Sequence, residues 1–266
     1  MKYRTLACLP VAVLLPLFVV ELAMGPSSLQ ADVIRAQVEL SKGFWLFGCL
    51  AAASVFERGD YLRRGWLLTG ATAGVYFMRD ATFIPPLHDA LPAGPLGVYS
   101  GLVVLAGNVV QVSGPWVLAR AWSVSGIEDT RASGRRTLLF VAALVVALAI
   151  TGGSIVVDTR RVVTGDVSAL VELASDLGDT ACFILVGPLL RTALALRGGV
   201  LAWTWSLFAT SLLAWMLYDG TQGVTTIAGV HTQAAPVYEL FHSIGAAYFG
   251  VAGLAQRRVV SVPAEA

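Results

Sequence analysis

The sequence predicts an all-α membrane protein, a polytopic bundle of eight transmembrane helices that forms a single domain over residues 1–266. Hydrophobic residues make up 56% of the chain and charged residues only 13%, whereas soluble domains are about one quarter charged. The mean hydropathy of +0.74 agrees with this composition. The apolar residues also gather into segments of about the 20 residues that a bilayer core requires. The polar intervals between these segments are too short for a separate soluble domain.

The eight segments lie near residues 6–25, 38–57, 65–84, 96–121, 137–157, 168–190, 200–218 and 235–256. The first follows Lys2 and Arg4 and has Ala23 and Gly25 at a possible cleavage site, so it resembles a signal peptide. We expect it to be retained because its apolar run is longer than that of a typical signal; cleavage would leave seven spans. The second contains only the 14 apolar residues "GFWLFGCLAAASVF" and needs the preceding "AQVELSK" to cross a bilayer.

The distribution of basic residues predicts that both termini are cytoplasmic, in a cell inner membrane. With the N-terminus inside, Arg35, Lys42, Arg160 and Arg161 fall outside, and Arg79 falls within a segment. The other thirteen of the eighteen basic residues fall on the cytoplasmic side: Lys2, Arg4, Arg58, Arg63, Arg64, Arg120, Arg131, Arg135, Arg136, Arg191, Arg197, Arg257 and Arg258.

Several function classes lack support in the sequence. The net charge is +1 and no basic run carries interleaved aromatic residues, so we expect no nucleic-acid partner. The chain contains no G-x-S-x-G, H-E-x-x-H, P-loop or Rossmann glycine pattern, so we do not expect a hydrolase or a nucleotide-dependent enzyme. Cys8, Cys49 and Cys182 lie singly in apolar runs, which is typical of packing residues.

An acidic stripe runs along the segment "VELASDLGDTACFILVGPLLR", residues 171–191. Glu172, Asp176 and Asp179 are spaced i, i+4 and i+7 and therefore share one face of a helix. Ionised carboxylates are costly inside lipid, so this face should meet a cation, water or another helix. We expect Arg79 to pair with Asp176 or Asp179. The stripe could equally line a structural contact between helices.

Three other segments bring polar groups to the same depth on the outer side. Arg79 and Asp80 lie towards the outer end of the third segment, and Asp219 ends the seventh. Glu239 and His242 lie one turn apart in the eighth segment. These positions predict one outward-open polar pocket that binds a ligand. Its predicted residues are Arg79, Asp80, Glu172, Asp176, Asp179, Asp219, Glu239 and His242.

Glu239 and His242 also have the Glu-x-x-His spacing that contributes metal ligands in helical bundles when other helices add carboxylates. A hydrogen-bonded core histidine fits the same spacing. The two residues are therefore candidates for a metal site, with the metal and any other cofactor left open.

The fourth segment contains "AGNVVQVSGPW", with Asn108 and Gln111 near mid-depth. Pro115 should kink this helix and free a backbone carbonyl group, because proline has no N–H to donate. The sequence therefore predicts an irregularity beside the polar pocket.

The last three segments resemble the multi-helix sensory region of bacterial membrane signalling proteins, which precedes histidine kinase or diguanylate cyclase domains. The resemblance rests on Gly178 and Asp179, on "LLRTALALRGG", on a Trp-rich helix that ends at Asp219, and on the small-residue final helix "ELFHSIGAAYFGVAGLAQRR". It implies a sensory module. This chain continues for only eight residues after Arg258, so we expect signalling through a separate membrane or cytoplasmic partner.

We therefore expect a sensory or ligand-binding membrane module, with the lipid bilayer as its surroundings, and favour this function over an enzymatic one. Three alternatives remain open. The same carboxylates could serve a proton- or cation-coupled transporter, Glu239 and His242 could belong to a metal-dependent membrane enzyme, or the chain could be a structural subunit of a membrane complex.

Overall fold

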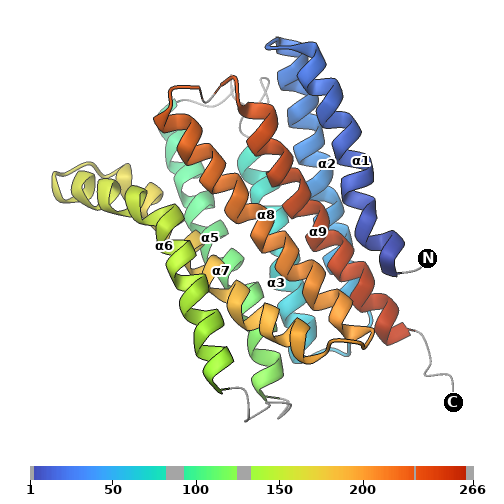
Figure 1. The fold of residues 1–266 in the computed structure, drawn as a ribbon. Coiled ribbons are helices and arrows are strands. Elements are labelled where there is room, and N and C mark those ends of the chain that lie inside the picture. The colour runs from blue at the N-terminus through green and yellow to red at the C-terminus, as the bar shows by residue number, and fades with distance from the viewer. Residues whose placement is uncertain (1–2, 82–92, 125–132, 231, 262–266) are drawn as a thin grey trace, which may run out of the picture.

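The computed structural model describes residues 3–81, 93–124, 133–230 and 232–261, and these parts of the chain form eight helices and no strand (Figure 1). The all-α prediction is confirmed. By length and composition, four of the helices, α1, α5, α6 and α8, are apolar enough to cross a membrane. In chain order the helices are α1 (Tyr3–Met24), α2 (Ser28–Ala53), α3 (Tyr61–Ala81), α5 (Ala93–Val124), α6 (Ser133–Val163), α7 (Ala169–Ala195), α8 (Leu201–Ile227) and α9 (Ala235–Ser261).

Six helices form a closed ring. Each packs against the next in the order α2, α3, α5, α7, α8 and α9, and α9 packs against α2 again. Helix α1 lies outside the ring against α9, and α6 lies outside it against α7. The start of α1 and the end of α9 lie at one end of the bundle, which we call the terminal end (Figure 1). The α1–α2 and α8–α9 connections lie at the opposite end.

Glycines allow close approach where α2 and α9 cross. A Cβ atom added to Gly253 would lie 2.2 Å from the carbonyl oxygen of Gly48, and one added to Gly250 would lie 2.6 Å from that of Phe44. Between α3 and α5, a Cβ on Gly114 would lie 2.7 Å from the backbone nitrogen of Thr69. Small residues at such crossings increase van der Waals contact between backbones, which is a main source of helix association in lipid.

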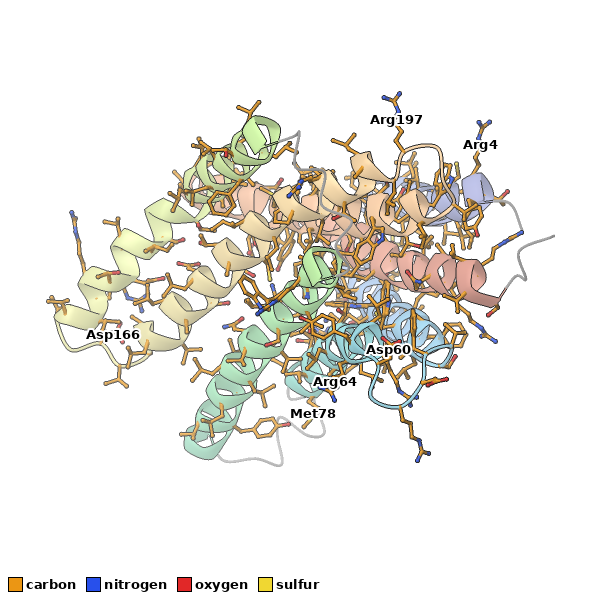
Figure 2. The ribbon with its side chains drawn as sticks, turned by 90° about the horizontal axis from the view of Figure 1, so that it is seen from below. Arg4, Asp60, Arg64, Met78, Asp166 and Arg197 are labelled. Carbon is orange, nitrogen blue, oxygen red and sulfur yellow. The ribbon has the colours of Figure 1, made fainter. Side chains whose placement is uncertain are left out.

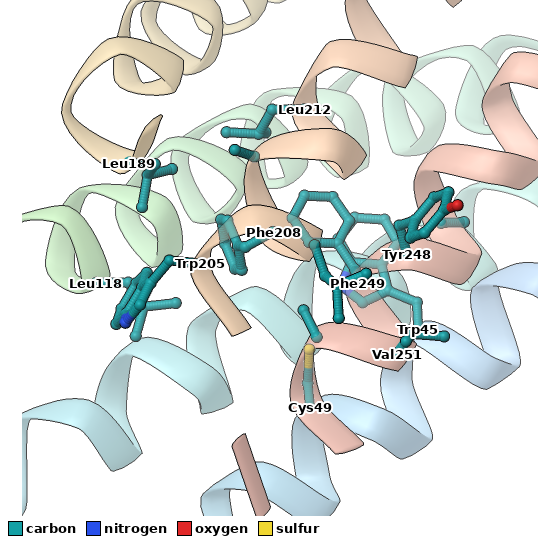
Figure 3. Close-up of a cluster of buried hydrophobic side chains, with 14 of the residues drawn as sticks. Trp45, Cys49, Leu118, Leu189, Trp205, Phe208, Leu212, Tyr248, Phe249 and Val251 are labelled. Atoms are coloured by element: carbon teal, nitrogen blue, oxygen red, sulfur yellow. The ribbon is translucent and has the colours of Figure 1, made fainter. Parts of the chain in front are cut away.

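Large buried side chains, most of them aromatic, pack together inside the ring (Figure 3), and we call this region the aromatic half. Trp45 stacks on Phe249 with ring centroids 4.5 Å apart, and Phe249 meets Phe208 edge to face at 4.9 Å. Phe208 in turn meets Trp66 at 5.7 Å. Leu118, Leu189 and Trp205 are also fully or almost fully buried in this core. The aromatic half consists of Trp45, Trp66, Leu118, Leu189, Trp205, Phe208 and Phe249.

Two helix boundaries differ from the predicted spans in an informative way. The second helix covers Ser28–Ala53 rather than 38–57, because Ser27 caps it by accepting a hydrogen bond from the backbone N–H of Gln30 at 3.1 Å. Helix α8 continues to Ile227, beyond the predicted end at 218. A hydropathy window finds the apolar centre of a helix and misses its polar turns. Lys2, Arg131 and residues 82–84 of the third predicted span lie outside the described residues.

The connection between α6 and α7 extends sideways from the ring as an arm, which we define as residues 154–172. The arm projects away from the other helices both from the side (Figure 1) and along the bundle, where Asp166 lies at its far end (Figure 2). One cation organises the arm, because Arg161 pairs with Asp158 at 3.0 Å, with Asp166 at 2.8 Å and with Glu172. The Ser168 hydroxyl group and the Arg161 guanidinium group lower the pKa of Asp166.

Candidate functional site

A buried lysine joins α2 to α3. The side chain of Lys42 is 1% exposed, and its ammonium group pairs with Glu39 on the same helix at 2.8 Å and with Asp80 on α3. The charge count places Lys42 on the outer side of the membrane, and in the structure α2 carries its side chain into the bundle. Two carboxylates therefore compensate a charge that would otherwise be very costly to bury.

Arg79 pairs with its neighbour Asp80, with Nε 2.6 Å from Oδ1, and its guanidinium group lies 5.1 Å from the centre of the Tyr76 ring. Among the described ion pairs, Arg79 is thus joined to Asp80 and not to the expected Asp176 or Asp179. Since Asp80 contacts both Lys42 and Arg79, one carboxylate bridges two cations. The result is a four-residue ion-pair network between α2 and α3.

His242 and Glu239 form the pair that their spacing predicts. Nδ1 of His242 lies 2.8 Å from Oε2 of Glu239, while Nε2 is buried without a partner. The imidazole ring lies between Trp215 and Tyr218, at centroid distances of 4.6 and 4.8 Å. A carboxylate on Nδ1 leaves the other ring nitrogen to meet a ligand.

Asp179 and Asp219 bring two carboxylates together across α7 and α8. Gln111 of α5 donates a hydrogen bond from Nε2 to Oδ1 of Asp179 at 2.8 Å. Asp219 interacts electrostatically with Asp179 and Asp176, and its Oδ2 atom is buried without a partner. Asp176 also faces Ser154 of α6. These carboxylates therefore lie close to one another and have no basic partner among the described ion pairs.

Aromatic rings connect these groups into one layer. Arg79 lies over the Tyr76 ring, which packs against Trp215 with ring centroids 6.1 Å apart, and Trp215 in turn packs against His242. We call this set the polar layer: Glu39, Lys42, Arg79, Asp80, Asp179, Asp219, Glu239 and His242, with Asp176 at its edge towards α6.

Glu172 is the predicted pocket residue that turns away from the others. Its side chain is 52% exposed and pairs with Arg161 on the arm. The spacing put it correctly one turn from Asp176, but α7 leaves the ring at this point, so the two carboxylates have different surroundings.

A small cavity lies directly next to the polar layer. All six ring helices line it, through Trp45, Thr69, Thr72, Gln111, Pro115, Cys182, Phe183, Leu212, Trp215 and Phe249. Its volume is about 10 Å³, which is room for about one water molecule. Gln111 belongs both to this lining and, through Asp179, to the polar layer. The cavity therefore separates the polar layer from the aromatic half.

Pro115 causes the predicted irregularity in the cavity wall. Because it has no N–H group, it cannot bond the carbonyl oxygen of Gln111 one turn earlier. The thiol group of Cys182 donates to that oxygen instead, at 3.5 Å. A freed carbonyl group thus links α5 to α7.

Several buried polar atoms around the cavity and the layer have no hydrogen-bond partner among the described residues. They include both donors and acceptors: Nε1 of Trp45 and Trp215, Nδ2 of Asn108, Oε1 of Gln111, Oδ2 of Asp176 and Asp219, and Nε2 of His242. Most buried polar groups in proteins are satisfied by protein, water or ligand. This concentration of unpaired atoms therefore points to a hydrated or ligand-binding region.

Sequence reasoning missed Glu39, Lys42 and Glu21. The signal for the first two was "ELSK", an i, i+3 acid–base pair directly before an apolar run. Glu21 of α1 is fully buried, and both of its carboxylate oxygens lack a partner. It interacts electrostatically with Glu239.

Within the described residues, no three His, Cys, Asp or Glu side chains are arranged to hold a metal ion, so Glu239 and His242 remain a pair. Comparisons with protein-family models, curated proteins and solved structures find no match to this chain.

Proposed function

We propose that this chain is a ligand-binding module of a bacterial inner membrane, in which all eight helices cross the bilayer and both termini are cytoplasmic. The polar layer then lies in the outer half of the membrane and opens outwards. Ligand binding rearranges the helix ring, and a separate partner at the terminal end receives the change. The basic residues that gather towards that end support this orientation.

The unpaired polar atoms around the central cavity are the main support for this proposal. They come from five helices of the ring, so a molecule bound among them would contact most of the bundle. A binding event could therefore change the packing of several helices at once. In this conformation the aromatic half closes the other end of the ring. This favours a binding site that opens on one side over a transport pathway through the ring.

The charges of the polar layer favour a small cationic ligand. The layer contains five carboxylates, Glu39, Asp80, Asp179, Asp219 and Glu239, against the permanent cations Lys42 and Arg79. Ammonium groups bind well to carboxylates and to aromatic faces such as those beside His242. The small cavity implies that an organic cation would need the helices to separate.

Reaction with a membrane-impermeant thiol reagent tests the outward opening. In a protein with Cys8→Ala and Cys182→Ser, cysteines replacing Asp176 and Glu239 should react with reagent added from outside. Native Cys49 is fully buried in the aromatic core and is the internal control that should stay unmodified. If the folded protein protects positions 176 and 239 as completely as Cys49, the polar layer is a sealed structural contact.

Thermal unfolding tests the ligand class. Methylammonium and tetramethylammonium chloride are compared with sodium chloride at equal ionic strength, since a ligand of the folded state raises the melting temperature. At least one ammonium ion should stabilise the parent protein and lose this effect with Asp219→Asn. Glu172→Gln on the arm is the matched control and should leave the effect unchanged.

A proton- or cation-coupled transporter is the second candidate. It is favoured by Asp179 and Asp219, because two neighbouring carboxylates in a low-dielectric region tend to share a proton or bind a cation. Proton flux in liposomes that requires Asp219 would select this function over binding alone.

A further inference from the structure

We propose that the arm, residues 154–172, lies along the lipid headgroup region of the outer leaflet and anchors the α6–α7 pair to the membrane surface. Its direction is the first reason. In the side view the arm runs roughly across the helices of the ring (Figure 1), and from below it projects outward from the bundle (Figure 2), as an element parallel to a membrane surface would. This inference uses the membrane location and orientation of the proposed function but does not depend on any ligand.

The length of α6 supports the same arrangement. Its 31 residues measure about 46 Å at 1.5 Å per residue, whereas a bilayer core is about 30 Å thick. A helix of this length has to tilt strongly or direct one end out of the core. The bend into the arm lets the last turns of α6 lie at the interface.

The exposed surface of the arm is largely apolar, and its charged side chains pair with one another between the two segments that form it. Val156, Val157, Val163, Val167 and Leu170 are 48–81% exposed, while Arg161 holds the carboxylates of Asp158, Asp166 and Glu172 between its two limbs. Apolar faces beside polar turns are typical of elements that lie in the membrane interface.

Lipid is the occupant that the rest of α6 indicates. Its span Thr137–Val163 runs directly into the arm, and only 11% of the apolar window of that span is buried within the protein, compared with 50% for α8. The apolar surface of the arm therefore continues one that is already suited to lipid. Arg160 is exposed among the valines, and its long side chain can reach a lipid phosphate group while its stem stays in the apolar region.

Spin labels on single cysteines test this position in phosphatidylcholine vesicles. With Cys8→Ala, Cys49→Ala and Cys182→Ser as background, labels replace Val163 and Val167 on the arm. Val145, exposed on α6 well before the arm, is the lipid control, and Arg58 in the α2–α3 connection is the water control. Relaxation by oxygen, which concentrates in lipid, is compared with relaxation by a water-soluble nickel chelate.

The arm labels should show oxygen-to-nickel ratios between those of the two controls, corresponding to a shallow depth. Ratios equal to that of Arg58 would place the arm in water and overturn the proposal. Low accessibility to both reagents would mean that protein covers the arm, and would also overturn it. A Val145 label that behaves like Arg58 would instead overturn the membrane arrangement on which the proposed function depends.

Discussion

The two halves of the helix ring differ in the side chains that hold them together. Towards the terminal end, large rings pack against one another and small residues bring the backbones close. At the other end, the same helices present acids, a lysine, an arginine and a histidine, and several polar atoms there lack a hydrogen-bond partner in the part of the chain that the structure describes. The change occurs beside the central cavity.

The buried rings of the aromatic half pack against one another, whereas some buried groups of the polar layer need a further partner. Packed apolar groups need no further partner, whereas buried polar groups without hydrogen bonds are costly unless water or a ligand satisfies them. The aromatic half therefore acts as the fixed base of the ring. The structure of the polar layer, in contrast, should change with the water molecules or ligand bound there.

The largest effect is expected from disturbing the α2–α9 crossing next to the aromatic half. Gly253→Ala would place a Cβ atom 2.2 Å from a backbone oxygen of Gly48, so the helices must separate, at a cost of about 4 kcal/mol or more. The matched control is Gly74→Ala on α3, where no atom lies within 4 Å of the new Cβ and the better helix former should stabilise by up to about 1 kcal/mol. Equal melting temperatures of the two variants in detergent would contradict this picture.

Removing the buried cation should produce the next largest effect and acts on the polar layer. Lys42→Met leaves Glu39 and Asp80 without their shared ammonium group, and losing one partner of a buried ion pair costs about 3–5 kcal/mol. Arg35→Met, at an exposed position of the same helix, should change stability by about 0.5 kcal/mol or less. Adding Glu39→Gln and Asp80→Asn to Lys42→Met should restore part of the loss in thermal unfolding; absence of any recovery would show that the carboxylates are not the source of the cost.

Arg79→Leu should cost less, because its side chain is 32% exposed and Asp80 keeps Lys42 as a partner. Losing one charge-assisted hydrogen bond implies about 1.5–2 kcal/mol, reduced further by solvent. Asp80→Asn should make the loss smaller in a double-mutant cycle. If Asp176→Asn or Asp179→Asn has that effect instead, the arginine pairs across to α7 as the sequence first suggested.

The helical class could be predicted from the sequence because composition and hydropathy report it directly, and each of the eight predicted segments overlaps one of the described helices. Helix direction and residue spacing also predict that Arg79, Asp80, Asp219 and the Glu239–His242 pair lie at one depth. Of these groups, the structure shows the Arg79–Asp80 and Glu239–His242 contacts. These features depend on the sequence of each helix by itself, or on the depth in the membrane that each residue reaches along its helix. They need no knowledge of which helices are neighbours.

The partners within the site depend on the order of the helices in the ring, and sequence spacing does not contain this order. Arg79 and Lys42 share Asp80 because α3 packs mainly against α2 and α5. The burial of Lys42 was not predicted, because the first half of α2 is polar and its apolar run alone is too short to indicate a full helix. Glu172 differs from Asp176 because α7 leaves the ring between them, and a regular helical stripe does not predict such a departure.

The smallest predicted effect lies at the boundary between the two halves, where Cys182 donates to the carbonyl oxygen of Gln111. Cys182→Ala would leave this buried oxygen without the thiol and should reduce stability by about 1 kcal/mol. Cys182→Ser keeps a donor of similar size and should cost less. Both variants are compared by thermal unfolding of the purified protein.

Pro115→Ala shows whether this bond repairs a gap left by proline. Alanine supplies the N–H group that a regular helix would direct at Gln111, so the oxygen would no longer depend on Cys182. In the Pro115→Ala background, Cys182→Ala should therefore cost much less than in the parent protein, with a coupling energy of about 0.5–1 kcal/mol. If the two changes are simply additive, Cys182 stabilises the boundary by packing alone. In that case the hydrogen-bond network of the polar layer ends at the side chain of Gln111 and does not continue through its backbone to α7.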